Sequence, residues 1–197
     1  MTQHTYANAI ELRAGHTPSA WINRWSALIA AGATVLDFAS GSGRNLPPLL
    51  ALGARVTAID RDAQALAGLP DGVERIVADL EGAPWPFAPE GSDTRRFDAV
   101  VCCNYLFRPR LARLFDLVAP GGLLLYETFA QGNERYGRPS NPDFLLRPGE
   151  LLAAAQQAGF EVLAYEAGFS GPARPARVQR LCAAHPEHAP ERYPLVG

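Results

Sequence analysis

The chain contains no lysine, because all 18 of its basic residues are arginine. This absence excludes every site that needs a lysine amine: a P-loop of the G-x-x-x-x-G-K type, a Schiff base or a pyridoxal anchor. Cysteine is scarce, with Cys102 and Cys103 adjacent in one apolar run and Cys182 in another, a spacing that suits neither a metal site nor a disulfide framework. We therefore expect no bound metal, core packing for Cys102 and Cys103, and a reducing, cytoplasmic environment.

The sequence also lacks long apolar runs and a surplus of one charge. No stretch of about 18 apolar residues occurs, and no basic segment followed by an apolar one stands at the start, so we expect neither a membrane span nor an export signal. The 18 basic and 20 acidic residues give a net charge of −2, which argues against a nucleic-acid partner. A length of 197 residues with 48% hydrophobic content suits one globular domain.

Short apolar runs alternate with helical stretches through the first two thirds of the chain. This alternation predicts a parallel sheet covered by helices on both faces, that is, a doubly wound α/β fold. Trp21, Trp25 and Leu28 recur at helical spacing and predict a cover helix over residues 18–31. The predicted strands are 33–39, 54–60, 72–79, 97–104 and 121–128, and the predicted helices between them are 46–52, 62–69 and 111–118.

The alternation stops after the fifth predicted strand. Residues 130–148 show no periodicity, and so long a loop in a compact domain is typical of a functional lid or of disorder. A helix at 149–158 and strands at 160–167 and 178–184 follow, and the bend between these strands predicts that they pair antiparallel at one sheet edge. We divide the single domain into a cover helix (1–32), a cofactor-binding core (33–128), a lid loop (129–148), a C-terminal helix and strands (149–184) and an irregular tail (185–197).

The segment VLDFASGSGRN, residues 35–45, predicts a buried strand, a glycine-containing turn and the start of a helix. Gly41 and Gly43 let a ligand approach the backbone closely, and the helix start offers unpaired N–H groups. A dinucleotide fingerprint needs a third glycine where Leu46 stands, and Asp37 suits an ammonium group better than a pyrophosphate. The turn thus predicts a ligand site, and a tight βα turn without a ligand is the alternative.

Two more carboxylates end the next two predicted strands. Asp60 lies beside the glycine turn in a doubly wound sheet and can accept hydrogen bonds from vicinal ribose hydroxyls, although a lone aspartate here is more often a helix N-cap. Asp79 can accept from the exocyclic amine of adenine while the N–H of Leu80 donates to the ring. A loop-capping aspartate that faces solvent is the alternative for Asp79. Together the two carboxylates predict an adenosine site.

The fourth predicted strand ends in Asn104 and Tyr105, at the carboxyl edge where α/β sheets bind ligands. We expect both residues to face the cofactor or the reacting group. The predicted cofactor-binding set is completed by Ala39, Ser40 and Asn45 in the glycine turn and by Arg61.

In this order the segments resemble class I S-adenosylmethionine-dependent methyltransferases over residues 35–128. LDFASGSG is similar to the family's acidic-glycine cofactor loop, Asp60 to its ribose-binding acid, Asp79 to its adenine-binding acid and APGGLLLYET to its fifth strand. The resemblance implies a seven-stranded sheet with the last strand antiparallel, and S-adenosylmethionine as cofactor with S-adenosylhomocysteine as product. Ala39 departs from the pattern, which often has glycine there. Residues 123–152 resemble small bacterial methyltransferases of the tellurite-resistance type.

Methyl transfer from a sulfonium is an in-line displacement, so the protein mainly orients the nucleophile and excludes water. A thiol or soft anion needs no general base. A hydroxyl or amine does, and Glu127 is the first candidate, before Tyr105 and His16. The alternative role for Glu127 is an ion pair with an arginine of the lid loop.

Arginines near the predicted crevice suggest an anionic acceptor, because a guanidinium can fork onto a carboxylate or oxyanion. Arg135, Tyr136 and Arg138 belong to the lid loop, Arg108 follows the fourth predicted strand, and His16 precedes the cover helix. A solvated charged loop is the alternative.

The sequence therefore predicts an S-adenosylmethionine-dependent methyltransferase that acts, as a monomer or homodimer, on a small anionic or soft-nucleophile acceptor. An RNA or protein methyltransferase of the same fold is the second hypothesis. A nucleotide-binding oxidoreductase that uses NAD, or an inactive binding module, is the third.

Overall fold

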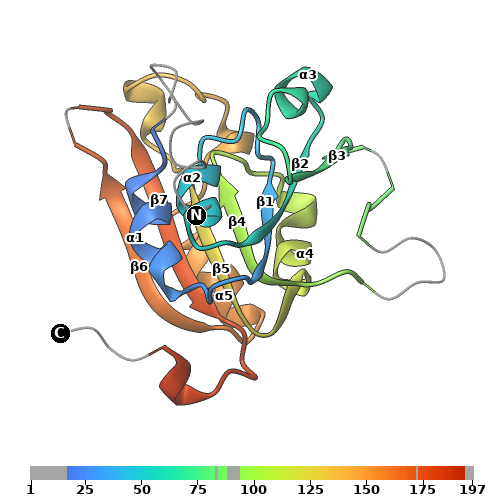
Figure 1. The fold of residues 1–197 in the computed structure, drawn as a ribbon. Coiled ribbons are helices and arrows are strands. Elements are labelled where there is room, and N and C mark those ends of the chain that lie inside the picture. Colours follow the sequence, from blue (N-terminus) through green and yellow to red (C-terminus); the bar gives the residue numbers. More distant parts are fainter. Residues whose placement is uncertain (1–16, 83, 88–93, 172, 194–197) are drawn as a thin grey trace.

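Seven strands form one sheet in the order β3-β2-β1-β4-β5-β7-β6 (Figure 1). The computed structural model describes residues 17–82, 84–87, 94–171 and 173–193. Neighbours among β1 to β5 are parallel, and β7 is antiparallel to both β5 and β6. The strands are β1 (Thr34–Phe38), β2 (Arg55–Asp60), β3 (Glu74–Val77), β4 (Phe97–Cys103), β5 (Val118–Phe129), β6 (Glu161–Phe169) and β7 (Arg177–Ala184). The predicted doubly wound sheet with an antiparallel edge is confirmed.

Helices cover both faces of the sheet, as the apolar strands require. One face packs against α1 (Ala20–Trp25), α2 (Leu46–Ala51) and α3 (Ala63–Ala67), and the other against α4 (Leu111–Asp116) and α5 (Glu150–Gln157). Neighbouring β4 residues Val100 and Val101 are both fully buried because each faces a helical layer. No helix in the described part of the chain is long and apolar enough to cross a membrane.

The cover helix is shorter than the predicted span of residues 18–31. The hydroxyl of Ser19 accepts a hydrogen bond from the N–H of Trp21 at 3.2 Å and begins α1, which ends at Trp25. A 3-10 turn, Ser26–Leu28, follows, and Ile29 is already extended. Ile29 is nevertheless buried, so the apolar spacing correctly identified a core-facing segment but overstated the length of its helix.

The segment 130–148, predicted as a lid loop, is anchored at both ends. The N–H of Gln131 donates to the carbonyl of Leu146 at 2.9 Å, and the N–H of Leu146 donates to Phe129 at 2.9 Å. Two 3-10 turns, Asn133–Arg135 and Pro142–Phe144, lie between these anchors. Residues 134–144 lie mostly at the surface, so any closing movement is limited to them.

Candidate active site

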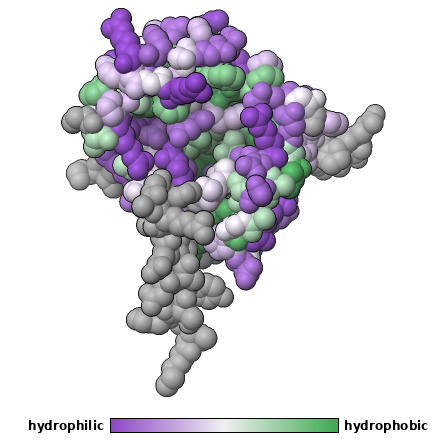
Figure 2. Space-filling model, turned by 90° about the horizontal axis from the view of Figure 1, so that it is seen from above, coloured by the Kyte–Doolittle hydropathy of each residue, from purple (hydrophilic) through white to green (hydrophobic). Residues whose placement is uncertain are grey.

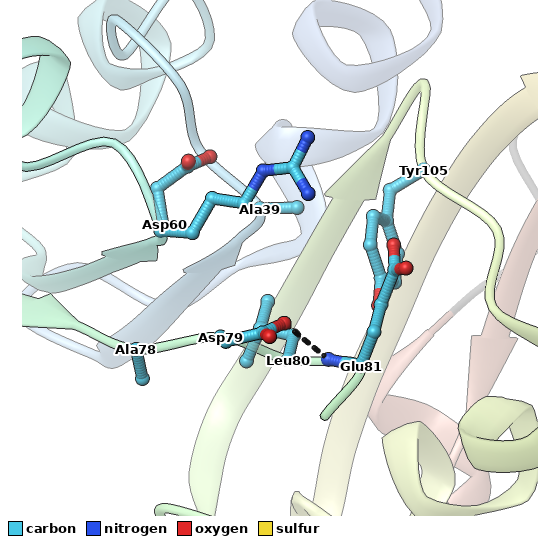
Figure 3. A pocket seen from close by; sticks show the side chains of 8 residues that line it. Ala39, Asp60, Ala78, Asp79, Leu80, Glu81 and Tyr105 are labelled. Atoms are coloured by element: carbon cyan, nitrogen blue, oxygen red, sulfur yellow. Dashed lines mark hydrogen bonds between the residues drawn. The ribbon is translucent and has the colours of Figure 1, made fainter. Parts of the chain in front are cut away.

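A pocket of about 120 Å³ opens at the carboxyl edge, where the chain order of the strands reverses between β1 and β4 (Figure 3). Seen from above, this side of the molecule is largely hydrophilic around a hollow in which apolar side chains appear (Figure 2). The pocket is lined by residues from the ends of β1, β2 and β4 and from the segment after β3, namely Ala39, Asp60, Arg61, Ala78, Asp79, Leu80, Glu81 and Tyr105.

The glycine turn, predicted as a tight turn, contains three residues in left-handed conformations. Ala39, Gly41 and Gly43 have φ of 55°, 53° and 74°. A Cβ on Gly43 would lie 2.5 Å from Leu69, so packing excludes a side chain there, whereas nothing described lies within 4 Å of a Cβ built on Gly41. The backbone at Gly41 is therefore open to a ligand. Ala39 holds a strained conformation without glycine's freedom.

Asp37 is the buried carboxylate beneath this turn. Its side chain is 1% exposed, and its Oδ2 has no hydrogen-bond partner among the described residues. Burial raises the pKa of Asp37 to about 7; nearby Arg44 acts to lower it, and Asp60 acts to raise it. A carboxylate in this state is suited to a cationic ligand group, which would supply the missing partner.

Asp60 fixes the glycine turn in place. Its Oδ2 accepts a hydrogen bond from the N–H of Gly41 at 2.7 Å, and its Oδ1 accepts from the N–H of Asp62 at 3.0 Å. The N-cap of α3 is Asp62, which accepts from Gln64 and Ala65. The alternative of Asp60 as the helix cap is therefore wrong, and its carboxylate lies in the pocket wall.

Asp79 faces the same pocket from the segment after β3. Its Oδ1 accepts from the N–H of Glu81 at 2.9 Å, and hydrogen bonds from the backbone of Glu81 and Gly82 lower its pKa. Tyr105 forms the opposite wall (Figure 3), with its hydroxyl buried and unpartnered among the described residues. Burial, followed by the charge of Glu81, raises the pKa of Tyr105, so the phenol stays neutral.

Other predicted cofactor residues have structural contacts. The side-chain oxygen of Asn45 accepts from the N–H of Ser19 at 3.0 Å and so ties the turn to α1. The buried hydroxyl of Ser40 has no hydrogen-bond partner in the part of the chain that the structure describes, and the carbonyl of Leu80 accepts from Arg110 at 2.7 Å. Asn104, exposed and left-handed with φ 57°, donates its N–H to the carbonyl of Glu127 at 2.8 Å.

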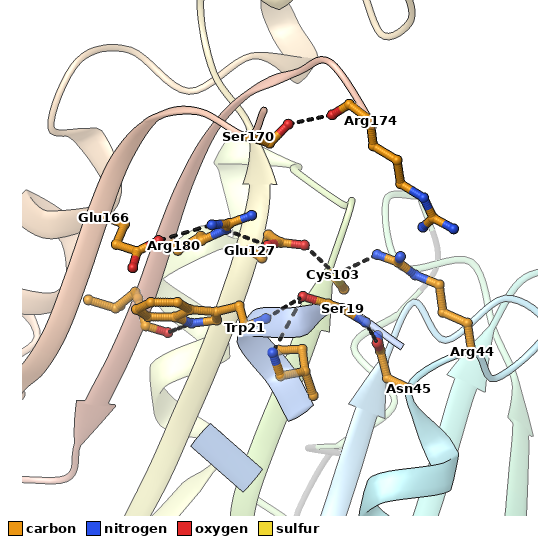
Figure 4. A network of polar contacts seen from close by, with 12 residues as sticks. Ser19, Trp21, Arg44, Asn45, Cys103, Glu127, Glu166, Ser170, Arg174 and Arg180 are labelled. Atoms are coloured by element: carbon orange, nitrogen blue, oxygen red, sulfur yellow. Dashed lines mark hydrogen bonds and ion pairs between the residues drawn. The ribbon is translucent and has the colours of Figure 1, made fainter. Parts of the chain in front are cut away.

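Glu127 belongs to a row of side chains that crosses four strands (Figure 4). Register partners Cys103, Glu127, Arg180 and Glu166 form this polar row. Glu127 Oε2 accepts from Arg180 Nε at 2.6 Å, and Glu127 Oε1 lies 3.6 Å from Cys103 Sγ. The alternative of an ion pair for Glu127 is correct, but the arginine comes from β7 and not from the lid loop.

The predicted acceptor arginines are not gathered at the pocket. Arg108 pairs with Glu150 at 2.7 Å and donates to carbonyls of Asp143 and Leu145 in the lid segment, so it anchors that segment; its role in acceptor binding stays a prediction. Arg135 and Arg138 are exposed, and Tyr136 stacks on Phe169 with ring centroids 5.1 Å apart. His16 lies outside the described residues.

A family model described as a methyltransferase domain matches residues 10–165. The chain belongs to this methyltransferase family. The predicted resemblance to class I S-adenosylmethionine-dependent methyltransferases is thereby confirmed, together with the enzyme class and the cofactor. A search of curated proteins gives no match.

Solved structures show the same fold at low sequence identity. TehB from Haemophilus influenzae is 18% identical, with a TM-score of 0.63 over 82% of this chain, which spans only 60% of TehB. An S-adenosylmethionine dependent methyltransferase from Mesorhizobium loti is 20% identical, with a TM-score of 0.61. The match covers 83% of this chain and 98% of the Mesorhizobium loti chain. The glycopeptide N-methyltransferase MtfA in complex with S-adenosylmethionine is 19% identical, with a TM-score of 0.58. The match covers 87% of this chain and 88% of MtfA.

The residues of this methyltransferase fit its cofactor. Asp37 Oδ2, which has no partner within the described ranges, suits an ammonium group, and the carboxylates of Asp60 and Asp79 suit hydroxyl and amine donors. Sequence reasoning missed Arg44 and Arg180. Arg44 lies within the segment 35–45, so its charge could have been noticed beside the glycine turn. Arg180 lies beside Glu127 only because β5 and β7 pair, which no local pattern in the sequence indicates.

Proposed function

We propose that this methyltransferase binds S-adenosylmethionine across the ends of β1, β2 and β4 and methylates a small acceptor. Asp37 and the open backbone at Gly41 receive the amino-acid end, Asp60 accepts from the ribose, and Asp79 with Leu80 receives the adenine beside Tyr105. The observation that carries the proposal is the convergence of Asp37, Asp60 and Asp79 around one left-handed glycine turn.

When bound, the cofactor supplies an already activated methyl group. The chain's own residues then have to orient the nucleophile and exclude water, and proximity alone is worth roughly 7–11 kcal/mol. Asn104 and Tyr105 directly follow β4, which lies between β1 and β5 in the sheet; Tyr105 lines the pocket, and the N–H of Asn104 donates to the carbonyl of Glu127. These contacts support an acceptor position above β4 and β5. We assign residues 33–128 to the cofactor-binding core, with Glu127 near the end of this core and its β7 neighbours assigned to the acceptor. Three unpaired cysteines suit a reducing compartment such as the cytoplasm.

Ligand-dependent melting tests this proposal. S-adenosylmethionine and S-adenosylhomocysteine are expected to raise the melting temperature, because a ligand at a hundred times its Kd stabilises the folded state by about 2.7 kcal/mol. NAD is expected to leave it unchanged. Stabilisation by NAD and none by S-adenosylhomocysteine would contradict the proposal.

A further inference from the structure

The polar row is unusual because it places charged side chains side by side on one face of the sheet. Cys103, Glu127, Arg180 and Glu166 are direct register partners, and register partners point to the same face. α1 covers this face, with the indole N–H of Trp21 donating to the carbonyl of Leu181 at 3.1 Å. The Cys103 end is buried and is contacted by Arg44 from the glycine turn, whereas Glu166 is exposed.

Arg180 holds the carboxylate of Glu127 in place. The guanidinium contacts Glu127 Oε2 at 2.6 Å and Glu166 Oε2 at 2.9 Å, so one cation is shared by two carboxylates. A carboxylate held by a guanidinium is a poor proton acceptor but a strong hydrogen-bond acceptor. Glu127, which is 8% exposed, is therefore better suited to receive an N–H than to remove a proton as a general base.

Arg44 brings a positive charge to the buried end of the row. Its Nη2 lies 2.8 Å from Cys103 Sγ, and within the described ranges it forms no ion pair with a carboxylate. Burial raises the pKa of Cys103 to about 12, so the sulfur is a neutral thiol and a weak acceptor. One sulfur atom therefore separates a guanidinium from a carboxylate that would otherwise attract each other (Figure 4).

We propose that Arg44 and Glu127 form the acceptor subsite, and that the acceptor is a small amine bearing a carboxylate or similar oxyanion. This inference rests on the function proposed above. The oxyanion takes hydrogen bonds from Arg44 that the thiol now receives, and the amine N–H donates to Glu127 Oε1. Arg180 is a positioning residue, because it acts through Glu127.

An amine fits this subsite better than a hydroxyl or a thiol. The nitrogen lone pair forms the new N–C bond while the S–C bond breaks and its electron pair stays on sulfur. The positive charge moves from sulfur to nitrogen, and the ammonium product releases its proton to water afterwards. The acceptor reacts as the neutral amine, having passed its ammonium proton to water before it binds, so the base that an amine needs is the solvent and not Glu127. The carboxylate of Glu127 then stabilises the charge that develops on nitrogen.

A panel of matched small molecules tests the acceptor class. We would measure S-adenosylhomocysteine formation with the common amino acids, their decarboxylated amines, 2-hydroxy acids and 3-mercaptopropionate. Calorimetry would measure binding of the same compounds to protein saturated with S-adenosylhomocysteine. Amino acids are expected to be methylated and to bind, with the other classes at least about tenfold weaker.

Variants separate the two roles. Arg44→Gln is expected to raise the amino-acid KM and Kd by about ten- to a hundredfold with little change in kcat, whereas Glu127→Gln lowers kcat about a hundredfold. Arg180→Gln is expected to lower kcat with little change in the amino-acid KM, because Glu127 loses the contact that positions it, and Arg180→Lys is expected to restore kcat. Arg55→Gln, at an exposed position at the start of β2, is the matched control and leaves all values unchanged.

Several outcomes overturn the inference. Methylation confined to hydroxy acids, thiols or amines without an oxyanion contradicts it, as does the absence of transfer to every amino acid. If Arg44→Gln weakens S-adenosylhomocysteine but not 5′-methylthioadenosine, Arg44 binds the cofactor's carboxylate and the acceptor assignment is wrong. A wild-type protein that does not bind S-adenosylhomocysteine contradicts the proposed function itself, a result distinct from all of these.

Discussion

Asp37 is expected to reduce stability in the free protein and to strengthen cofactor binding, with both effects controlled by pH. Its pKa rises from 3.8 to about 7 on folding. Between these values the unfolded chain has lost the proton that the folded protein keeps, so stability falls as pH rises through this window. At about 1.4 kcal/mol for each pKa unit, the buried charge costs up to about 4 kcal/mol above pH 7.

Asp37→Asn removes this cost and should reverse the ranking of wild type and variant between two assays. Urea unfolding at pH 8 is expected to show the variant more stable by about 2–4 kcal/mol, with the difference vanishing near pH 4. Calorimetry at pH 8 should show S-adenosylhomocysteine binding weaker by about ten- to a hundredfold, since a charge-assisted hydrogen bond is worth about 1.5–3 kcal/mol. Wild-type affinity should rise as pH increases through about 7.

Asp98→Asn is the matched control, because it is expected to change the free energy of unfolding in the opposite direction. Burial acts to raise the pKa of Asp98, but hydrogen bonds from Thr34 outweigh it and the net shift is downward. Asp98 therefore contributes stability above its ordinary pKa that is lost in acid, and Asp98→Asn should be less stable at pH 8 with unchanged cofactor affinity. If Asp37→Asn follows the wild-type stability profile between pH 4 and pH 8, the assignment of a buried, unpaired carboxylate is wrong.

The other predictions concern the turn and the lid segment. Asp60→Ala should weaken S-adenosylhomocysteine binding by about ten- to a hundredfold. Asp62→Ala should only lower stability by about 1 kcal/mol, because it removes the N-cap of α3. Calorimetry that finds the same S-adenosylhomocysteine affinity in both variants would refute this. Ala39→Gly should relieve the strain of the left-handed backbone and raise the free energy of unfolding in urea by up to about 1 kcal/mol. A lower free energy of unfolding in the variant would contradict this prediction. Arg108→Gln should speed proteolysis within residues 134–144, because it removes the ion pair with Glu150 and the hydrogen bonds to three carbonyls, those of Pro142, Asp143 and Leu145. An unchanged rate would show that other contacts anchor the segment.

The cofactor half could be predicted from sequence because its signals are local. The glycine turn, Asp37 and the start of α2 are neighbours in the chain, and the parallel order of β1 and β2 then places Asp60 beside them. Even the departure at Ala39 has a direct structural result, a left-handed alanine. The sequence pattern did not predict contacts between side chains that are far apart in the chain, such as the ion pair of Arg108 with Glu150.

The proposed acceptor half depends on strand register, which no short segment encodes. Glu127 was identified by its place at the end of a predicted strand. Its interpretation as a general base changes because Arg180 lies opposite it and pairs with its carboxylate. A shift of one residue between β5 and β7 would turn Arg180 to the other face and leave Glu127 buried without its cation. Changes in the β6 and β7 hairpin can therefore alter acceptor choice while the cofactor residues, which belong to β1, β2 and the segment after β3, keep their positions.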